Sequence, residues 1–182
     1  MKIVLVNVLL FKYKKGLILP KRKKMDPAYQ ISYSPPIGLL YIGGSIEEEG
    51  HSVEIIDFYF EKNPIETLYK SLNSADAIGL NVYTPTYKDT AYIAKIIKES
   101  NPDLPIIIGG PHCTLQLDRS LLNIPDADIA VIGEGEQIIK DIIKFLEGKK
   151  QLSEILGIYY QDNSRKNKAI FYFSLIIFLI CL

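Results

Sequence analysis

The chain has 182 residues, of which 48% are apolar, so it can bury one sizeable core, and one domain with a tail is expected. Its 21 basic and 21 acidic residues cancel, which argues against nucleic acid or an anionic membrane surface as a partner recognised through net charge. Only Cys113 and Cys181 occur, so there is no disulfide framework and no C-x-x-C metal motif, and this cysteine usage is typical of the cytoplasm.

The N-terminus begins with a short apolar run that has no charged n-region and no small-residue cleavage site, so it predicts a core strand over residues 2–9. A polar, lysine-rich stretch follows, punctuated by Gly16 and Pro20. A loop of about 25 residues at this point exceeds the usual connection length, and such loops are commonly functional or disordered. It is either a solvated basic loop or a contact for a phosphate or a partner.

Proline is tolerated in the first turn of a helix, so Ser34-Pro35-Pro36 predicts a helix start, and Gly50 suits the position after its end. This helix is expected to present one face made of Ile37, Leu40, Tyr41 and Gly44.

Strands and helices then alternate along the chain. Further strands are expected at residues 53–57, 76–82, 105–108 and 129–132, and helices at residues 64–73, 86–100, 115–122 and 136–146. Five apolar strands in this pattern predict an α/β fold: a Rossmann-like or flavodoxin-like, doubly wound, five-stranded parallel sheet of order 2-1-3-4-5 with helices on both faces. A short strand at residues 157–161 would begin a connection to another element.

Open parallel sheets bind ligands at the carboxyl ends of their strands, so the segments after the strands are the candidate site. Tyr83-Thr84-Pro85-Thr86 follows the third strand. The hydroxyls of Thr84 and Thr86 suit polar ligand edges, and Thr86 is equally suited to cap the next helix.

Two glycine-containing turns follow the next two strands. In Gly109-Gly110-Pro111-His112 the missing Cβ atoms let a ligand approach the backbone, although a structural turn is the alternative. His112 could contact a ligand, but no second residue at a metal-ligand spacing accompanies it, so no metal site is expected. In Gly133-Glu134-Gly135-Glu136 the carboxylates could accept hydrogen bonds or favour the start of the next helix.

Several familiar catalytic signatures are missing. No G-x-G-x-x-G follows the first strand, and neither G-x-x-x-x-G-K-[ST] nor G-x-S-x-G occurs. Nicotinamide, ATP and serine-hydrolase chemistry are therefore disfavoured, and no catalytic residue is assigned.

Five runs in one order resemble a known family. They are Ser34-Pro35-Pro36-Ile37-Gly38-Leu39-Leu40-Tyr41, Gly50-His51-Ser52-Val53-Glu54-Ile55-Ile56-Asp57, Gly79-Leu80-Asn81-Val82-Tyr83-Thr84, Gly109-Gly110-Pro111-His112 and Val131-Ile132-Gly133-Glu134-Gly135-Glu136. Over residues 1–161 the chain resembles the N-terminal cobalamin-binding domain of B12-dependent radical S-adenosylmethionine (SAM) enzymes, which include methyltransferases and the anaerobic magnesium-protoporphyrin cyclase. The resemblance implies a Rossmann-like sheet that holds cobalamin at its C-terminal edge. A barrel domain with an iron–sulfur cluster bound by C-x-x-x-C-x-x-C would follow it.

The resemblance also implies the cofactor-binding residues, which would contact the corrin or its nucleotide tail. They are Tyr83, Thr84, Pro85, Thr86, Gly109, Gly110, Pro111, His112, Thr114, Gly133, Glu134, Gly135 and Glu136. The D-x-H-x-x-G motif of cobalamin proteins with a histidine lower ligand is absent, which suits the radical SAM group.

The C-terminal residues depart from the family pattern. Residues 1–161 are expected to form the cobalamin-binding domain, and residues 162–182 a basic and then apolar tail without C-x-x-x-C-x-x-C. The abrupt apolar run over residues 169–182 is typical of a truncated or out-of-frame sequence. It is shorter than the ~20 residues that span a bilayer, so a marginal membrane anchor and a core-packing segment are the alternatives.

The expected function is that of a cytoplasmic cobalamin-binding module that is not catalytic alone. The iron–sulfur cluster and SAM would belong only to the missing radical SAM domain, which has either been lost or could be supplied in trans by a separate chain. Two alternatives stay open: a cofactor-free interaction or regulatory domain on the same fold, and a tail-anchored membrane protein.

Overall fold

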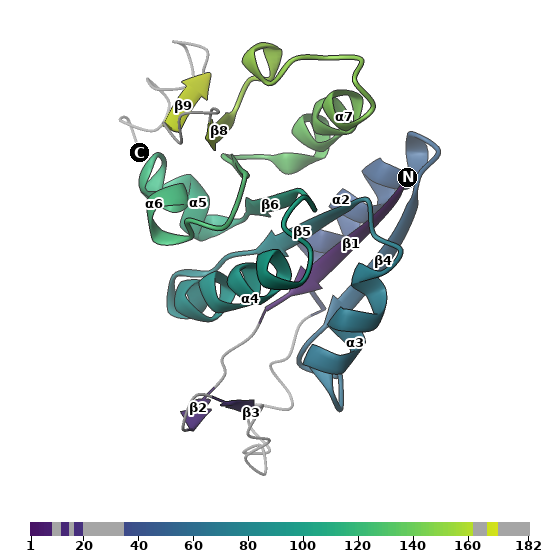
Figure 1. Ribbon diagram of the computed structural model, residues 1–182. Coiled ribbons are helices and arrows are strands. Elements are labelled where there is room, and N and C mark those ends of the chain that lie inside the picture. Colours follow the sequence, from purple (N-terminus) through teal and green to yellow (C-terminus); the bar gives the residue numbers. More distant parts are fainter. Residues whose placement is uncertain (9–11, 15–16, 20–34, 162–166, 171–182) are drawn as a thin grey trace.

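A seven-stranded sheet of order β4-β1-β5-β6-β7-β8-β9 forms the centre of the protein (Figure 1). The computed structural model describes residues 1–8, 12–14, 17–19, 35–161 and 167–170. The five parallel strands are β1 (Lys2–Asn7), β4 (Ser52–Asp57), β5 (Ala77–Asn81), β6 (Ile106–Gly109) and β7 (Ile129–Val131). Their order confirms the predicted 2-1-3-4-5 arrangement. The sheet is larger than predicted, because β8 (Ile158–Gln161) and β9 (Asn167–Ile170) add two antiparallel strands beyond β7.

Helices cover both faces of the sheet. One face carries α2 (Ile37–Glu48) and α7 (Gly135–Leu146), which contact each other. The opposite face carries α3 (Pro64–Leu72), α4 (Tyr87–Ser100), α5 (Pro111–Gln116) and α6 (Arg119–Asn123). Short 3₁₀ turns, η1 (Thr84–Thr86) and η2 (Leu152–Glu154), complete the described connections.

Side-chain alternation along the strands divides the core into two layers. In β1, Ile3 and Leu5 pack toward α2 and α7, whereas Val4 and Val6 pack into the layer beneath α3 and α4. All four side chains are at most 2% exposed, as expected for a central parallel strand covered on both faces.

Helix α2 packs through a face different from the predicted one. Ile37, Leu40 and Tyr41 are at least half exposed, while Leu39 and Ile46 are buried. Gly43 is also buried, and a Cβ there would lie 3.5 Å from the side chains of Val53 and Ile55 on β4, so this glycine lies at the contact of helix and sheet.

The predicted single helix over residues 115–122 was wrong in its boundaries. Helix α5 already begins at Pro111, because Gly110 turns the chain with φ 110° and proline suits the first helical position. Leu117, with φ 52°, then separates α5 from α6, since an L residue in this conformation interrupts a right-handed helix.

Two predicted irregular segments contain short strands. Within the predicted N-terminal loop, β2 (Lys12–Lys14) and β3 (Leu17–Leu19) form an antiparallel pair. Within the predicted tail, β9 pairs with β8. The rest of the loop and of the apolar run lies outside the described residues. Among the helices that the structure describes, none has the length and apolar character needed to cross a membrane.

We expect Ile97→Ala on α4 to lower the free energy of unfolding by about 2–5 kcal/mol, because Ile97 is fully buried and its truncation leaves a cavity. Urea unfolding followed by circular dichroism measures the change. Lys95→Ala on the same helix is the control and should change stability by less than about 0.5 kcal/mol, since Lys95 is exposed. Equal effects of the two substitutions would contradict the assigned packing of α4.

Candidate functional site

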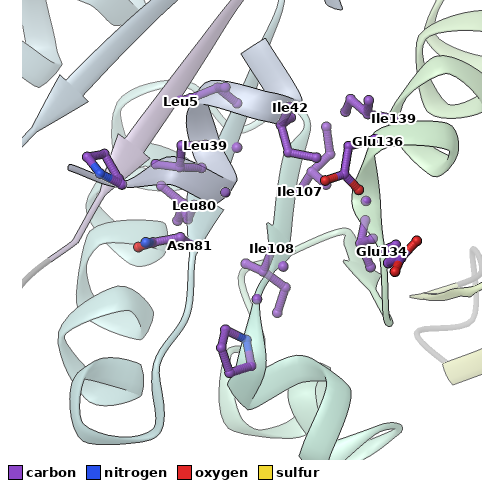
Figure 2. A pocket seen from close by; sticks show the side chains of 18 of the residues that line it. Leu5, Leu39, Ile42, Leu80, Asn81, Ile107, Ile108, Glu134, Glu136 and Ile139 are labelled. Carbon is purple, nitrogen blue, oxygen red and sulfur yellow. The ribbon is translucent and has the colours of Figure 1, made fainter. Parts of the chain in front are cut away.

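A cavity of about 330 Å³ lies at the C-terminal edge of the sheet, on the face covered by α2 and α7 (Figure 2). Its volume falls in the ~300–1,000 Å³ range of small-molecule sites. The lining residues come from β1, α2, β5, β6, β7 and the start of α7, so strands far apart in sequence build it together. The cavity is therefore at the edge where the sequence predicted a ligand.

The inner wall of the cavity, which we call the floor, is aliphatic. It comprises Leu5, Leu39, Ile107, Val131 and Ile139, each at most 8% exposed. Leu80 and Ile108 also line the cavity, but their side chains belong to the core of the opposite face. The rim consists of partly or fully exposed residues around the mouth: Pro36, Gly38, Tyr83, Gly109, Gly110, Pro111, Gly133, Glu134, Gly135 and Glu136. The cavity thus has an apolar interior and polar groups at its opening.

Two lining glycines are required by geometry. A Cβ at Gly79 would lie 2.6 Å from Cδ2 of Leu5, so glycine leaves room for this floor side chain. Gly110 has φ 110°, and a Cβ there would also lie 3.1 Å from the carbonyl oxygen of Val82. Side chains at these positions would displace the cavity wall.

Asn81 contributes the buried polar side chain of the cavity wall, and a hydrogen-bond chain holds it in place. Its Nδ2 donates to Oδ1 of Asn7 at 2.8 Å, and its Oδ1 accepts from the backbone N–H of Val8 at 3.2 Å. Nδ2 of Asn7 in turn donates to Oδ1 of Asp57 at 3.1 Å. Burial raises the pKa of Asp57, against the opposing effect of the hydrogen bonds that its carboxylate accepts from the backbone N–H of Tyr59 and from Asn7. These hydrogen bonds connect the C-terminal ends of β4, β1 and β5 beside the cavity.

Thr114 connects the two glycine-containing turns. Its Oγ1 accepts a hydrogen bond from the backbone N–H of Gly133 at 3.0 Å and donates to the carbonyl of Gly110 at 3.3 Å. One hydroxyl therefore sets the distance between two parts of the rim.

His112 is engaged within the protein and does not line the cavity. It is 2% exposed, and its ring stacks on Tyr87 with a centroid separation of 5.0 Å. Nδ1 lies 3.3 Å from Oγ1 of Thr84, and Nε2 lies 3.5 Å from Nδ2 of Asn123. Because an amide nitrogen only donates, Nε2 is the acceptor and Nδ1 carries the proton. Burial lowers the pKa of His112, which keeps the ring neutral at pH 7.

The structure brings eight of the thirteen predicted site residues to the cavity: Tyr83, Gly109, Gly110, Pro111, Gly133, Glu134, Gly135 and Glu136. The other five, Thr84, Pro85, Thr86, His112 and Thr114, lie outside the lining. Thr86 Oγ1 donates to the carbonyl of Tyr83 at 3.2 Å and makes no side-chain cap on α4. Cofactor contact by any of the thirteen stays a prediction.

Sequence reasoning about the strand exits missed the floor and Asn81. From the sequence, the floor residues are predicted to be ordinary core residues. Aliphatic residues line a cavity and fill a packed core equally well, so residue type does not tell the two apart. The signal for Asn81 was present, since a polar residue ends the apolar strand β5 just as Asn7 ends β1.

The start of α7 supplies the polar part of the rim. Helix α7 begins at Gly135, and no side chain caps its first-turn amides. Glu136 lies in this first turn, where a carboxylate interacts favourably with the helix dipole. Figure 2 shows Glu134 and Glu136 on the α7 side of the cavity. The rim therefore offers backbone donors and carboxylate acceptors.

The described residues hold no cluster of three or more His, Cys, Asp or Glu side chains that could bind a metal. Burial raises the pKa of the Cys113 thiol to about 12, so it is protonated at neutral pH. The geometry of the described residues thus supports binding of a compact apolar group with polar substituents at the mouth.

Replacing Thr114 by valine should lower the free energy of unfolding by about 0.5–1.5 kcal/mol, because both hydrogen bonds are lost while the shape is kept. Thr114→Ser retains the hydroxyl and should recover most of that loss. Denaturant unfolding of both variants tests the assignment, and a serine variant as unstable as the valine variant would contradict it.

The neutral state of His112 predicts a pH dependence of stability. Its pKa is lowered from 6.5 in the folded protein, so the unfolded chain takes up the proton more readily. Its contribution is complete above about pH 6.5 and is lost as the pH falls below that value. The difference in unfolding free energy between the wild type and His112→Gln should therefore shrink from pH 7.5 to pH 5.5. A constant difference would show that His112 does not titrate in this way.

Comparison with known proteins identifies relatives of this fold and site. Two curated relatives are an uncharacterized methyltransferase, PH0819, from Pyrococcus horikoshii, 30% identical over 151 residues, and the anaerobic magnesium-protoporphyrin IX monomethyl ester cyclase from Synechocystis, 29% identical over 135 residues. The matches cover 82% and 72% of this chain but 33% and 27% of the relatives, so the chain spans a third or less of their length.

Solved structures share the fold. The cobalamin-dependent SAM radical enzyme OxsB, with aqua-cobalamin and SAM bound, superposes with a TM-score of 0.71 at 22% identity, over 93% of this chain and 22% of OxsB. The radical SAM methyltransferase TsrM from Kitasatospora setae gives a TM-score of 0.72 at 18% identity, over 93% of this chain and 30% of TsrM. The family model described as the B12 binding domain matches residues 32–143, which include α2, the strands β4 to β7 and most of α7. These matches confirm the predicted resemblance, and the chain belongs to the B12-binding domain family.

Proposed function

We propose that this chain binds cobalamin through the cavity, with the floor around the aromatic base of the nucleotide tail. The observation that carries the proposal is an apolar cavity at the C-terminal edge of the sheet in a chain of the B12-binding family. A corrinoid is far larger than about 330 Å³, but the base that ends its tail is compact and apolar. Because Gly79 and Gly110 carry no Cβ, Leu5 and the turn after β6 can lie where they do in the cavity wall, which leaves the space for such a group open.

The rim would hold the polar parts of the cofactor. The carboxylates of Glu134 and Glu136 would accept hydrogen bonds from ribose hydroxyls or corrin amides, and the first-turn amides of α7 would donate to acceptors. Among the predicted contact residues outside the lining, Thr114 and His112 would act by fixing the turns that carry the rim.

The wider role that we propose is that of the cofactor-holding module of a methyltransferase- or cyclase-like radical SAM protein. Cobalamin, when bound, would supply alkyl-transfer or radical-assisting chemistry, and residues 1–161 would position and shield it. The two cysteines of the chain cannot form a C-x-x-x-C-x-x-C cluster site, so the iron–sulfur and SAM chemistry would come from a domain outside these residues. The module alone would bind cobalamin without catalysing a reaction.

We expect the full chain to retain cobalamin through gel filtration, and Gly38→Phe to weaken binding at least ~10-fold. Gly38 lies on the rim and a Cβ there meets no atom within 4 Å, so phenylalanine can obstruct the mouth without a steric clash in the fold. Gly44→Phe is the matched control, because Gly44 lies on the same helix, has equally open surroundings and does not line the cavity.

Affinity is measured by titration with hydroxocobalamin, read from the visible spectrum of the protein peak. A folded, colourless wild type would overturn the proposal and favour a cofactor-free interaction domain. Retained cobalamin with equal affinity in both glycine variants would instead place the binding site away from this cavity.

A further inference from the structure

We infer that the cavity selects corrinoids by the base of their nucleotide tail, accepting an apolar benzimidazole-type base and discriminating against a purine base. This inference rests on the proposed function, because it requires the tail to enter the cavity. It adds a specificity that follows from the chemistry of the floor.

The floor has no polar side chain to offer a purine. All five of its members are aliphatic and buried. The neighbouring amide of Asn81 already bonds to Asn7 and Val8 at 2.8 and 3.2 Å. Across the described residues, no buried side-chain nitrogen or oxygen lacks a partner. Asn81 thus uses one N–H and one oxygen lone pair inside the protein, so a base on the floor meets this single amide and otherwise aliphatic side chains.

Backbone groups near the cavity are also engaged. The carbonyl of Gly109 accepts from the N–H of Val82 at 2.7 Å, and the carbonyl of Gly110 accepts from Thr114. The N–H of Gly133 donates to the same threonine hydroxyl. A ligand would have to break an existing hydrogen bond to reach the N–H of Gly133, and the uncapped backbone donors lie at the rim, at the start of α7.

The carboxylates of Glu134 and Glu136 do not change this conclusion. Glu134 is exposed and Glu136 half-buried at the start of α7, so both belong to the rim. They can serve the part of the ligand at the mouth, and Figure 2 shows Glu136 next to Ile107 and Ile139, at the border of the aliphatic floor.

The cost of a purine follows from its polar groups. Adenine carries an exocyclic amino group and several ring nitrogens that bond to water before binding and would lose those bonds on the floor. A dimethylbenzimidazole base of similar shape replaces most of these groups with carbon. Leaving such groups unpaired lowers affinity, and we expect an adenine-containing cobamide to bind roughly 10- to 100-fold more weakly than cobalamin.

The test is a titration of the full chain with three corrinoids that carry the same cyano ligand: cobalamin, the adenine-containing cobamide and cobinamide, which lacks the nucleotide. Affinities are read from visible absorbance. Cobalamin should bind tightest, and cobinamide at least ~10-fold more weakly, because it places nothing on the floor.

A variant pair links the selectivity to the cavity. Ile42 is half-buried on α2, and its side chain lines the cavity, so Ile42→Gln places an amide against the ligand. The ratio of the affinity for cobalamin to the affinity for the adenine-containing cobamide should decrease at least ~3-fold in this variant. Leu40→Gln is the control, because Leu40 is half exposed on the same helix outside the lining, and its ratio should equal that of the wild type.

Each outcome separates the two proposals. Equal affinity for the two cobamides overturns the selectivity but leaves cobalamin binding standing. Cobinamide bound as tightly as cobalamin shows that the base does not enter the cavity, and overturns the selectivity as well. Failure of all three corrinoids to bind removes the proposed function itself, and this inference with it.

Discussion

Parallel pairing of β1, β5, β6 and β7 is the interaction on which the site depends. The register sets Asn81 of β5 opposite Gly109 of β6, so the two strands end level with each other. The pairing continues past the strands, because the N–H of Val82 donates to Gly109 and the N–H of His112 donates back to Val82. These two bonds hold the turn at Gly110 next to the end of β5. The backbone hydrogen bonds between the strands therefore determine the positions of the rim residues.

The two faces of the sheet use this edge differently. Beneath α4, α5 and α6, the stacked rings of His112 and Tyr87 occupy the space next to the exits. On the other face, α2 and α7 meet along their lengths, but glycines at their cavity ends keep the backbone close and the side chains sparse. Packed side chains thus cover this edge on the face of α4, α5 and α6, while the cavity lies on the face of α2 and α7.

Most of the fold was predictable because strand length, apolar character and helical breaks are local properties. The order of the parallel strands was predicted from the flavodoxin-like arrangement that five alternating strands and helices commonly adopt. The packed face of α2 was not predictable, since Ile37, Leu40 and Tyr41 are as apolar as the buried Leu39 and Ile46. The two faces differ in their tertiary contacts, such as that of Gly43 with β4, which the local pattern does not encode. The break at Leu117 carries no glycine or proline signal, so it too escaped the local pattern.

The candidate site divides in the same way. Its rim was predictable from the glycine-containing turns, because loops after parallel strands converge on one edge. Its floor was not, since Leu5 and Ile107 differ from other strand residues only in what lies across from them. Gly79 is evident in the sequence, but the reason for a glycine there is not. A Cβ at this position would lie only 2.6 Å from Cδ2 of Leu5, and that proximity arises from the pairing of β1 with β5.

The hydrogen bonding of the edge has a consequence for binding energy. The bonds among Asn81, Asn7 and Asp57, and those of Thr114, satisfy the buried polar groups from within the protein. The wall can therefore hold its shape without help from a ligand, and binding need not bear the entropic cost of ordering it. Affinity would then come from apolar burial on the floor, and orientation from the few polar groups at the rim. Such a division would let one edge of the sheet hold a large cofactor by a small part of its surface.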